Sequence, residues 1–446
     1  MVIRAADLFT VAIRELEDDP VLLVHANAVM TGEISSQLLQ PVRERTTQAL
    51  RASGMLRSQN SCFPLSHPPR NCDNSEFIAY LRSNRLSQQF PSQELPINVA
   101  VIGVGAFGHN HARIYRQLQQ TGSVRLVGVV DADTSRADAV AREFDCKSFG
   151  SVEQLLTTHS EVQAASVAVP TVLHLHVART LMEADVDVLI EKPIAASLAE
   201  VDELLRVAAQ CQCVAQVGHL ERFNPAVRAT LPLINRPMFF EVHRLSVFSP
   251  RALDVDVVLD LMIHDLDIVL TFVNSEVKEI RAVGLPVLSG KVDIANVRVE
   301  FQSGCVANFT ASRVSTERVR KLRFFQPGQY ISLDYGRQDV LVFSVEPAPA
   351  TAAGTADKTA LASTPRLPAA PTVNPRIQMS KPPVTAEEPL LAEIQSFLAA
   401  VRTRSRPVVS LDDGRRALQL ALAILDEIAH HAARIGLANN QPPSKQ

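Results

Sequence analysis

The glycine-rich turn built on Gly103, Gly105 and Gly108 is the part of the sequence whose spacing most clearly predicts chemistry. It follows an apolar run and opens a helical stretch, with Ala106 and Phe107 before the last glycine. In a dinucleotide-binding turn, the first glycine makes the tight bend, the second lets the backbone approach a pyrophosphate, and the third allows close helix–strand packing. The helix N-terminus adds N–H groups for the phosphates. We interpret these residues as a dinucleotide site; a glycine-rich turn that binds none is the alternative.

A carboxylate stands at the end of the next apolar run. Asp131 follows Gly108 near the spacing of about 20 residues at which an acidic side chain binds the ribose hydroxyls of a dinucleotide. Its charge would repel the 2′-phosphate of NADP. We therefore predict NAD as the cofactor, with NADP less favoured, although the nearby Arg136 could moderate that exclusion.

A lysine follows the apolar run at residues 186–190, in the tripeptide Glu191-Lys192-Pro193. In an open α/β sheet, ligands bind outside the carboxyl ends of the strands. An ammonium group placed there could stabilise a developing alkoxide, and desolvation could make it a proton-transfer group. The alternative is a surface lysine in a turn.

Asp260 and His264 form a second candidate pair within a helix-like run. Residues four apart share one helix face, so both side chains would project together. A carboxylate beside an imidazole can fix its tautomer and orientation, as a general base requires. The alternative is an aspartate in the first helical turn beside a histidine with a purely structural role.

The first half of the pattern predicts a parallel sheet. From Ile97, short apolar runs alternate with helical stretches, which is typical of strands covered on both faces. The predicted strands are residues 97–103, 124–131, 164–169, 186–191 and 213–218, and the predicted helices include residues 108–120 and 198–210.

After Gly218 one helical stretch, 255–273, is accompanied by many strand-like segments, which is typical of an α+β domain. We expect an α/β protein with an N-terminal Rossmann doubly wound parallel sheet, then an α+β domain with a mostly antiparallel open sheet. The predicted strands of this part are residues 239–247, 278–287, 295–302, 305–314, 321–325, 330–335 and 339–345, and further helices are predicted at 387–401 and 411–435.

These patterns divide the chain into four regions. Residues 1–96 form an extension that we expect to be partly helical or disordered, and residues 97–217 form the Rossmann dinucleotide-binding domain. Residues 218–346 plus 387–437 form the α+β substrate and oligomerisation domain. The segment 347–386 is rich in Pro and Ala and has no aromatic residue, so we expect a disordered insertion.

Composition excludes several other classes of function. The 44 basic and 47 acidic residues give a formal net charge of −3, so no chain-wide basic field exists for nucleic acid. Six cysteines in 446 residues are too few for a disulfide framework, and no Cys/His spacing predicts a metal site. No run of about 18 apolar residues predicts a membrane span. We expect a cytoplasmic protein.

Taken together, the motifs resemble the glucose–fructose oxidoreductase and inositol dehydrogenase family, written Gfo/Idh/MocA. The resemblance covers about residues 97–347 and resumes over 388–429. It rests on the glycine turn, His111, Asp131, the segment Pro170-Thr-Val-Leu-His174, the Glu191-Lys192-Pro193 tripeptide, and Asp260 with His264.

The resemblance implies an enzyme that oxidises a sugar or polyol hydroxyl to a ketone and passes hydride to a nicotinamide. It makes Lys192, Asp260 and His264 the catalytic group, with either His264 or Lys192 as the base and Asp260 orienting His264 or binding substrate. It also implies that the glycine turn, Asp131 and Lys192 bind the cofactor together with Pro170, His174 and Glu191.

Within that family, residues 218–225 and 254–267 look most like enzymes acting on nucleotide sugars, of the UDP-N-acetylglucosamine 3-dehydrogenase type. We expect Arg222, Asn224, Arg244 and Arg251 near the substrate, because guanidinium groups suit a diphosphate; ordinary ion pairs are the alternative. A free sugar, inositol or another cyclic polyol is the alternative substrate, and a non-catalytic dinucleotide-binding protein the third possibility. A homo-oligomer, dimer or tetramer, is expected because an open sheet has a face to bury.

Overall fold

The computed structural model describes residues 95–249, 255–346 and 376–437. The predictions for the extension before residue 95, for Arg251 and for residues 347–375 lie outside the described residues. No helix in the described ranges is both long enough and apolar enough to cross a membrane.

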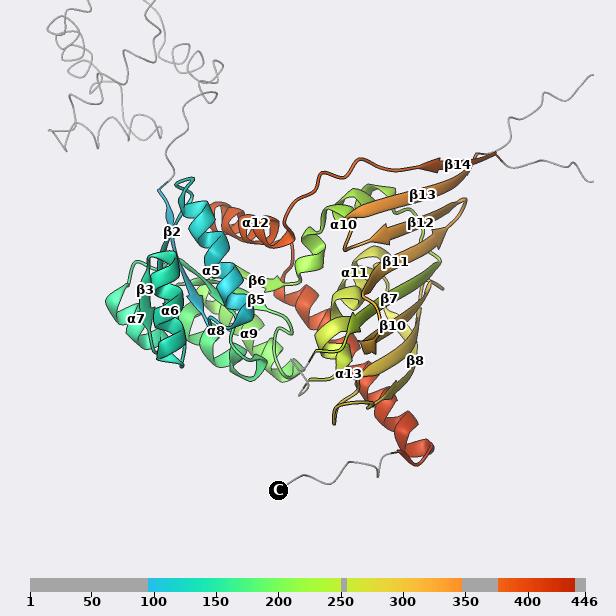
Figure 1. The fold of residues 1–446 in the computed structure, drawn as a ribbon, viewed down its shortest axis with the longest axis horizontal. Helices are drawn as coiled ribbons and strands as arrows, with labels where there is room; N and C mark the ends of the chain where they lie inside the picture. The colour runs from blue at the N-terminus through green and yellow to red at the C-terminus, as the bar shows by residue number, and fades with distance from the viewer. Residues whose placement is uncertain (1–94, 250–254, 347–375, 438–446) are drawn as a thin grey trace, which may run out of the picture. The chain divides into compact units, whose positions relative to one another are not determined.

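The first sheet has six parallel strands in the order β3-β2-β1-β4-β5-β6, which confirms the predicted Rossmann sheet (Figure 1). The side chains of β1 alternate between two hydrophobic clusters, with Ala100 and Ile102 in one and Val99 and Val101 in the other. The sheet is therefore buried on both faces, as apolar strands require. Its strands are β1 (Ile97–Ile102), β2 (Val124–Val130), β3 (Lys147–Phe149), β4 (Ala164–Val167), β5 (Asp187–Glu191) and β6 (Ala215–Gly218).

Three helices of this half, α6, α7 and α9, begin at polar capping residues. Asp133, Ser151 and Ser197 each accept a hydrogen bond from a backbone N–H three residues on, which satisfies a donor that the first helical turn leaves unpaired. The helices are α5 (Ala106–Gln119), α6 (Thr134–Phe144), α7 (Val152–Thr158), α8 (His174–Met182) and α9 (Leu198–Cys211), with short 3₁₀ turns η2 (Thr171–Leu173) and η3 (Leu220–Phe223).

The second sheet has eight strands in the order β14-β13-β12-β11-β7-β10-β9-β8. All neighbouring pairs are antiparallel except β7 and β10, so the predicted mostly antiparallel sheet is confirmed. The strands are β7 (Phe239–Val247), β8 (Val277–Leu285), β9 (Ile294–Phe301), β10 (Val306–Ser315), β11 (Val319–Gln326), β12 (Gln329–Asp334), β13 (Asp339–Glu346) and β14 (Arg376–Ser380).

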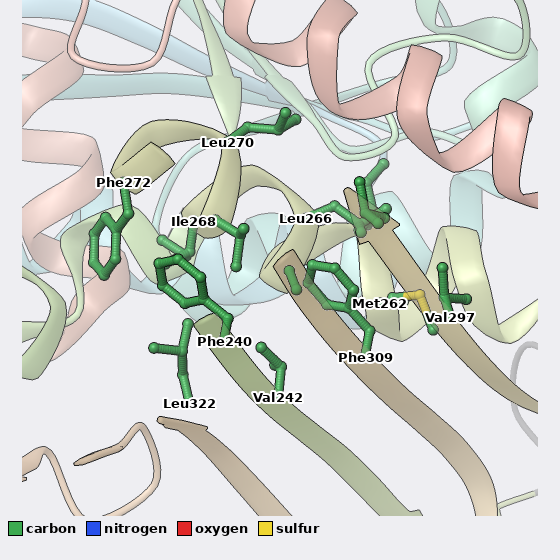
Figure 2. Packing of buried hydrophobic residues seen from close by; sticks show 14 of the residues in the cluster. Phe240, Val242, Met262, Leu266, Ile268, Leu270, Phe272, Val297, Phe309 and Leu322 are labelled. Atoms are coloured by element: carbon green, nitrogen blue, oxygen red, sulfur yellow. The ribbon is translucent and has the colours of Figure 1, made fainter. Parts of the chain in front are cut away.

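Helices cover one face of this sheet and enclose its core. Figure 2 shows Phe240, Val242 and Phe309 from the strands packed against Met262 and Leu266 from the helical layer. The remaining helical elements of the described chain are α10 (Pro225–Thr230), η4 (Leu231–Leu233), the π-helix η5 (Val258–Met262), α11 (Ile263–Val273), α12 (Pro389–Thr403) and α13 (Leu411–Arg434).

The last two helices differ from the predicted domain division. The sequence-based boundaries placed residues 387–437 with the second domain, but Phe397 of α12 is buried in the same cluster as Tyr115 of α5. Helix α13 contributes Leu418 to a Rossmann cluster and Ile424 to the second core. Helix α12 thus packs on the Rossmann half, whereas α13 joins the two halves.

Two strands were not predicted. Strand β3 has three residues and no apolar run, so its sequence carries no strand signal. Strand β14 lies within the segment 347–386 that we expected to be disordered, and this expectation is wrong for residues 376–380. Its backbone pairs with β13 in antiparallel register, so main-chain hydrogen bonds rather than side-chain burial hold it.

Candidate active site

The glycine turn has the backbone geometry that a dinucleotide site needs. Gly103 has φ +84°, and a Cβ there would lie 2.7 Å from the carbonyl oxygen of Ala168. A Cβ on Gly108 would lie 1.7 Å from the carbonyl oxygen of Gly103, so only glycine fits. At Gly105, by contrast, a Cβ would meet no atom within 4 Å. The first and third glycines are needed for packing, and the second leaves open space beside the backbone.

The start of α5 faces that open space without a side-chain cap. Gly105 is the N-cap residue, and no side chain accepts a hydrogen bond from the first turn of the helix. These N–H groups therefore suit a pyrophosphate, which would bind to them and to the positive end of the helix dipole.

A cavity of about 780 Å³ extends from the turn to the end of β2. Asp131 is fixed at its edge, because its carboxylate accepts hydrogen bonds from the backbone N–H groups of Val104 and Asp133, both at 2.9 Å. Arg136 lies 3.2 Å from the same carboxylate and 3.2 Å from that of Asp133. The residues that line the cavity include Gly103, Gly105, Asp131, Arg136, Val169 and Pro170. The cavity has the donors and the fixed acceptor that the phosphate and ribose of NAD require.

Lys192 lies at the carboxyl end of β5 and is held against η5. Its side chain is 9% exposed, and its Nζ donates to the carbonyl oxygen of Asp260 at 2.7 Å and lies 3.4 Å from Asp260 Oδ1. The predicted geometry of Asp260 and His264 is different, because residues 258–262 form a π-helix rather than an α-helix. In that wider turn the i and i+4 side chains do not stack, and Asp260 contacts Lys192 instead of His264 in the part of the chain that the structure describes.

His264 is a buried residue whose pKa is affected by the charge of Lys192. Its Nδ1 is enclosed and has no hydrogen-bond partner among the described residues. Burial, and then the positive charges of Lys192, Arg244 and Arg320, hold the pKa of His264 well below its usual range. The imidazole is consequently neutral at physiological pH, with a ring nitrogen free to accept a proton.

A buried chain of hydrogen bonds supports the strand that carries Lys192. Glu191 Oε1 lies 2.9 Å from His111 Nε2, His111 Nδ1 lies 2.9 Å from Ser166 Oγ, and Tyr115 OH lies 2.9 Å from the same Ser166 Oγ. Burial would raise the pKa of Glu191, but the hydrogen bond and charge of His111 and the charge of Lys192 outweigh it and lower that pKa. Ser166 and Tyr115 were not predicted, because their positions carry no recognisable motif.

Comparison with known proteins agrees with this geometry. The family described as "Oxidoreductase family, NAD-binding Rossmann fold" matches residues 97–219, and the GFO/IDH/MocA C-terminal domain matches residues 238–325. UDP-N-acetylglucosamine 3-dehydrogenase of Acidithiobacillus ferrooxidans is 35% identical over 330 residues, which are 74% of this chain and 96% of that protein. The chain belongs to the GFO/IDH/MocA family of oxidoreductases.

Solved structures extend the likeness of this GFO/IDH/MocA chain to its fold. The A. ferrooxidans enzyme has a structure with a TM-score of 0.65 and 32% identity, covering 75% of this chain and 98% of that one. Levoglucosan dehydrogenase in complex with NADH and levoglucosan has a TM-score of 0.63 at 17% identity, over 75% of this chain and 98% of that one. Among curated relatives, scyllo-inositol 2-dehydrogenase (NAD(+)) of Bacillus subtilis is 26% identical over 237 residues, 50% of this chain and 69% of that protein.

Two predicted cofactor residues of this oxidoreductase have different surroundings. Pro170 lines the cavity, as expected for a residue near the cofactor. His174 does not line it: the ring is 1% exposed, with Nδ1 2.9 Å from the carbonyl oxygen of Pro193 and Nε2 2.9 Å from that of Val169. The imidazole connects the loops after β4 and β5, so His174 supports the site rather than facing the cofactor.

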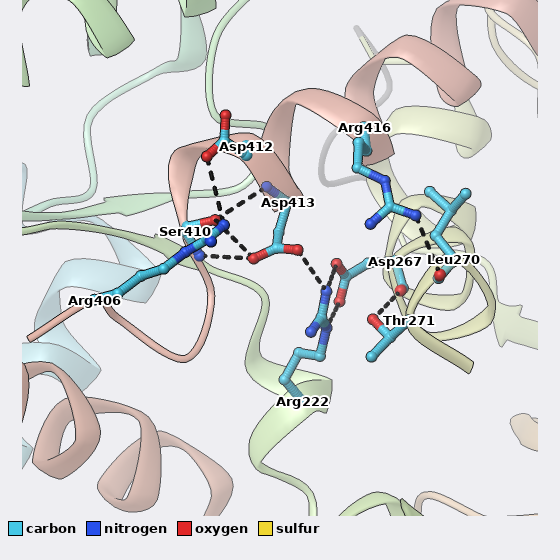
Figure 3. A network of polar contacts seen from close by, with 9 residues as sticks. All are labelled: Arg222, Asp267, Leu270, Thr271, Arg406, Ser410, Asp412, Asp413 and Arg416. Atoms are coloured by element: carbon cyan, nitrogen blue, oxygen red, sulfur yellow. Dashed lines mark hydrogen bonds and ion pairs between the residues drawn. The ribbon is translucent and has the colours of Figure 1, made fainter. Parts of the chain in front are cut away.

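The predicted substrate arginines are already occupied. Arg222 forms a two-pronged ion pair with Asp267, at 2.6 and 2.8 Å, and lies 3.6 Å from Asp413 (Figure 3). Arg244 is 5% exposed and forms the same kind of pair with Asp265, at 2.6 and 2.9 Å. Arg222 and Arg244 thus form the ion pairs that were the alternative to a role in binding a diphosphate.

The predicted substrate residue Asn224 is likewise a structural group. It is 2% exposed, its side chain caps α10 by accepting from the N–H of Ala226, and its amide donates to Glu221 and to the carbonyl oxygen of Tyr335. Arg251 lies outside the described residues. Within those residues, no group of three or more His, Cys, Asp or Glu side chains could hold a metal ion.

His219 is a site residue that the sequence analysis missed. Glu191 pairs with Gly218 in the parallel register of β5 and β6, so Lys192 and His219 are the next residues at the same sheet edge. The ring is 1% exposed, and neither nitrogen has a hydrogen-bond partner among the residues described. Burial lowers the pKa of His219, so the ring is a neutral polar group beside Lys192. Its position directly after the predicted strand 213–218 is the one signal that could have identified it.

Proposed function

We propose that this NAD-binding oxidoreductase oxidises a hydroxyl of a nucleotide-activated amino sugar to a ketone, with the 3-hydroxyl of UDP-N-acetylglucosamine as the first candidate. The observation that carries the proposal is the contact of Lys192 Nζ with Asp260 at the carboxyl end of β5, on the chain that also forms the nucleotide cavity. The 35% identity to a UDP-N-acetylglucosamine 3-dehydrogenase, over 96% of that enzyme, supports the choice of substrate.

The surroundings of His264 and Lys192 suggest a different catalytic role for each. His264 Nδ1 has no hydrogen-bond partner among the described residues, so it is the nitrogen available to accept the proton of the reacting hydroxyl. The Lys192 ammonium, fixed by the main chain of Asp260, can stabilise the negative charge that develops on that oxygen. NAD, held by the glycine turn and Asp131, supplies the acceptor for the hydride. The assignment of His264 as the base and Lys192 as the stabilising cation is part of this proposal.

Reduction of NAD tests the proposal directly. Absorbance of NADH should grow with UDP-N-acetylglucosamine and remain flat with free N-acetylglucosamine or myo-inositol. Growth with a free polyol alone would favour the second candidate, a polyol dehydrogenase, and no growth with any of these compounds would favour a non-catalytic role. Lys192→Met and His264→Gln should each lower kcat by roughly 10²- to 10⁴-fold. Lys147→Met, which removes an exposed lysine from β3, is the matched control and should leave kcat unchanged.

The outer face of the second sheet supports a homo-oligomer as part of the same proposal. An aromatic row crosses four adjacent strands, with ring centroids 5.7 Å apart for Phe239 and Phe325, 4.9 Å for Phe325 and Tyr330, and 5.6 Å for Tyr330 and Phe343. Phe325 is 37% exposed. Light scattering should give a mass above that of the 48.7 kDa chain, and Phe325→Asp should lower it.

A further inference from the structure

Two arginines at the start of β11 differ from the other cations near the site. Arg318 and Arg320 form no ion pair or side-chain hydrogen bond with any described residue, and both are exposed. Two carboxylates whose charges act on Arg320, Asp265 and Glu221, are already engaged, because both bind Arg244. Neither guanidinium is therefore held in an ion pair within the described residues.

The strand register places Arg320 on the inner, helix-covered side of the sheet. Arg320 lies directly opposite Arg244 in the antiparallel pairing of β11 with β7. Side chains alternate along a strand, so Arg320 shares its face with Leu322 and Phe324, which are fully buried in the core. Arg320 therefore sits one step beyond the edge of the core, where that face opens to solvent.

The positive charge of Arg320 affects the pKa of His264. It is one of the charges that lower the pKa of His264, together with those of Lys192 and Arg244. Partial desolvation by nearby protein atoms, and then repulsion from Arg244 and Arg318, lower the pKa of Arg320 itself. A guanidinium stays protonated in proteins, so Arg320 keeps its positive charge and the repulsion between these arginines remains. An anion bound to Arg320 would reduce this repulsion.

We propose that Arg320, with Arg318 beside it, binds the diphosphate of the nucleotide-sugar substrate while the sugar ring lies between Lys192 and His264. This inference rests on the proposed function and names the residues that recognise its substrate class. Guanidinium groups bind phosphate oxygens in two-pronged, charge-assisted hydrogen bonds, and two adjacent groups match the two phosphates of a diphosphate. Arg222 and Arg244, in contrast, are paired with carboxylates.

Titration of the full-length protein with UDP, followed by calorimetry in the presence of NAD, tests the assignment. Arg320→Gln should raise the Kd for UDP by about tenfold or more, the effect of one lost charge-assisted hydrogen bond, with the Kd for NAD unchanged. Arg337→Gln is the matched control, since it removes an exposed arginine of the same domain, in the turn between β12 and β13. An equal Kd for UDP in the wild type and Arg320→Gln, or no binding of UDP by the wild type, would overturn the inference.

Kinetics separate this inference from the proposed function. If the wild type oxidises UDP-N-acetylglucosamine and Arg320→Gln raises KM without a matching loss of kcat, both stand. If the wild type turns over that substrate and Arg320→Gln has an unchanged KM, the inference alone fails. If the wild type does not oxidise it, the proposed function fails, and the UDP titration still decides whether Arg320 binds a diphosphate.

Discussion

Glu393 is a buried carboxyl group whose protonation state can be tested directly. It lies in α12 with 0% exposure, and neither carboxylate oxygen has a hydrogen-bond partner among the described residues. Burial, and then the charge of Glu191, raise the pKa of Glu393 well above its usual range, so the folded protein holds it as a neutral acid. Its neighbour Gln216 donates to the Glu393 carbonyl oxygen at 3.2 Å and has an unpaired Oε1. Glu393→Gln would replace the acid with a neutral group of nearly the same shape.

The sign and size of the effect follow from proton linkage. Above the ordinary pKa of about 4.3, the unfolded chain releases the Glu393 proton while the folded protein retains it. The free energy of unfolding therefore falls by about 1.4 kcal/mol for each pH unit, until the pH reaches the raised pKa of the folded state. Glu393→Gln has no such proton. Its stability relative to the wild type should increase with pH at this slope.

Equilibrium urea unfolding at pH 5, 6 and 7, followed by circular dichroism, measures this difference. Other titrating groups, including the buried histidines, contribute equally to both proteins and cancel in the comparison. Glu183→Gln, an exposed position at the end of α8, should show a constant difference from the wild type. A constant difference for Glu393→Gln as well would mean that Glu393 is ionised in the folded protein, and the reasoning would be refuted.

Three further substitutions test other parts of the structure. Asp131→Ser should raise kcat/KM with NADP relative to NAD by about tenfold or more, because it removes a carboxylate that repels the 2′-phosphate and releases Arg136; steady-state kinetics with both cofactors measure this. Asp265→Asn should lower the free energy of unfolding by about 3–5 kcal/mol, since it leaves the buried charge of Arg244 without its two-pronged partner; urea unfolding measures the loss. Phe240→Ala should cost about 3–5 kcal/mol in the same assay, because Phe240 is fully buried at the centre of the second core.

The fold could largely be predicted because its strands carry strong local signals. The predicted strand at residues 239–247 coincides with β7, where buried and partly buried residues alternate along its central part. Strands β1 and β4 of the first sheet are nearly continuous apolar runs, as expected for strands covered on both faces. Strands β3 and β14 could not be predicted, because partners in neighbouring strands hold them and their own sequences do not indicate a strand.

The candidate site also has features that could be predicted from the sequence and features that could not. The glycine turn was predictable because three glycines act within a single local turn. The state of the arginines was not, because a guanidinium is free or occupied according to residues far away in the sequence. Asp267 lies 45 positions after Arg222, whereas Arg320 has no such partner in the described ranges. Arginine at a plausible position therefore says little about ligand binding until its carboxylate neighbours are known.

The π-helical turn explains why the position of Lys192 depends on the fold more than on a single side chain. Of the two contacts that hold its ammonium, the shorter, at 2.7 Å, is to the main-chain oxygen of Asp260, and the carboxylate is 3.4 Å away. The turn itself is anchored by Val258 and Met262, which are buried in the second core. Lys192 belongs to the Rossmann half, whereas the carbonyl group of Asp260 belongs to the second half. Packing of the second core therefore determines the position of the carbonyl oxygen that holds the Lys192 ammonium. Loss of core packing should therefore impair the site even when every polar residue is retained.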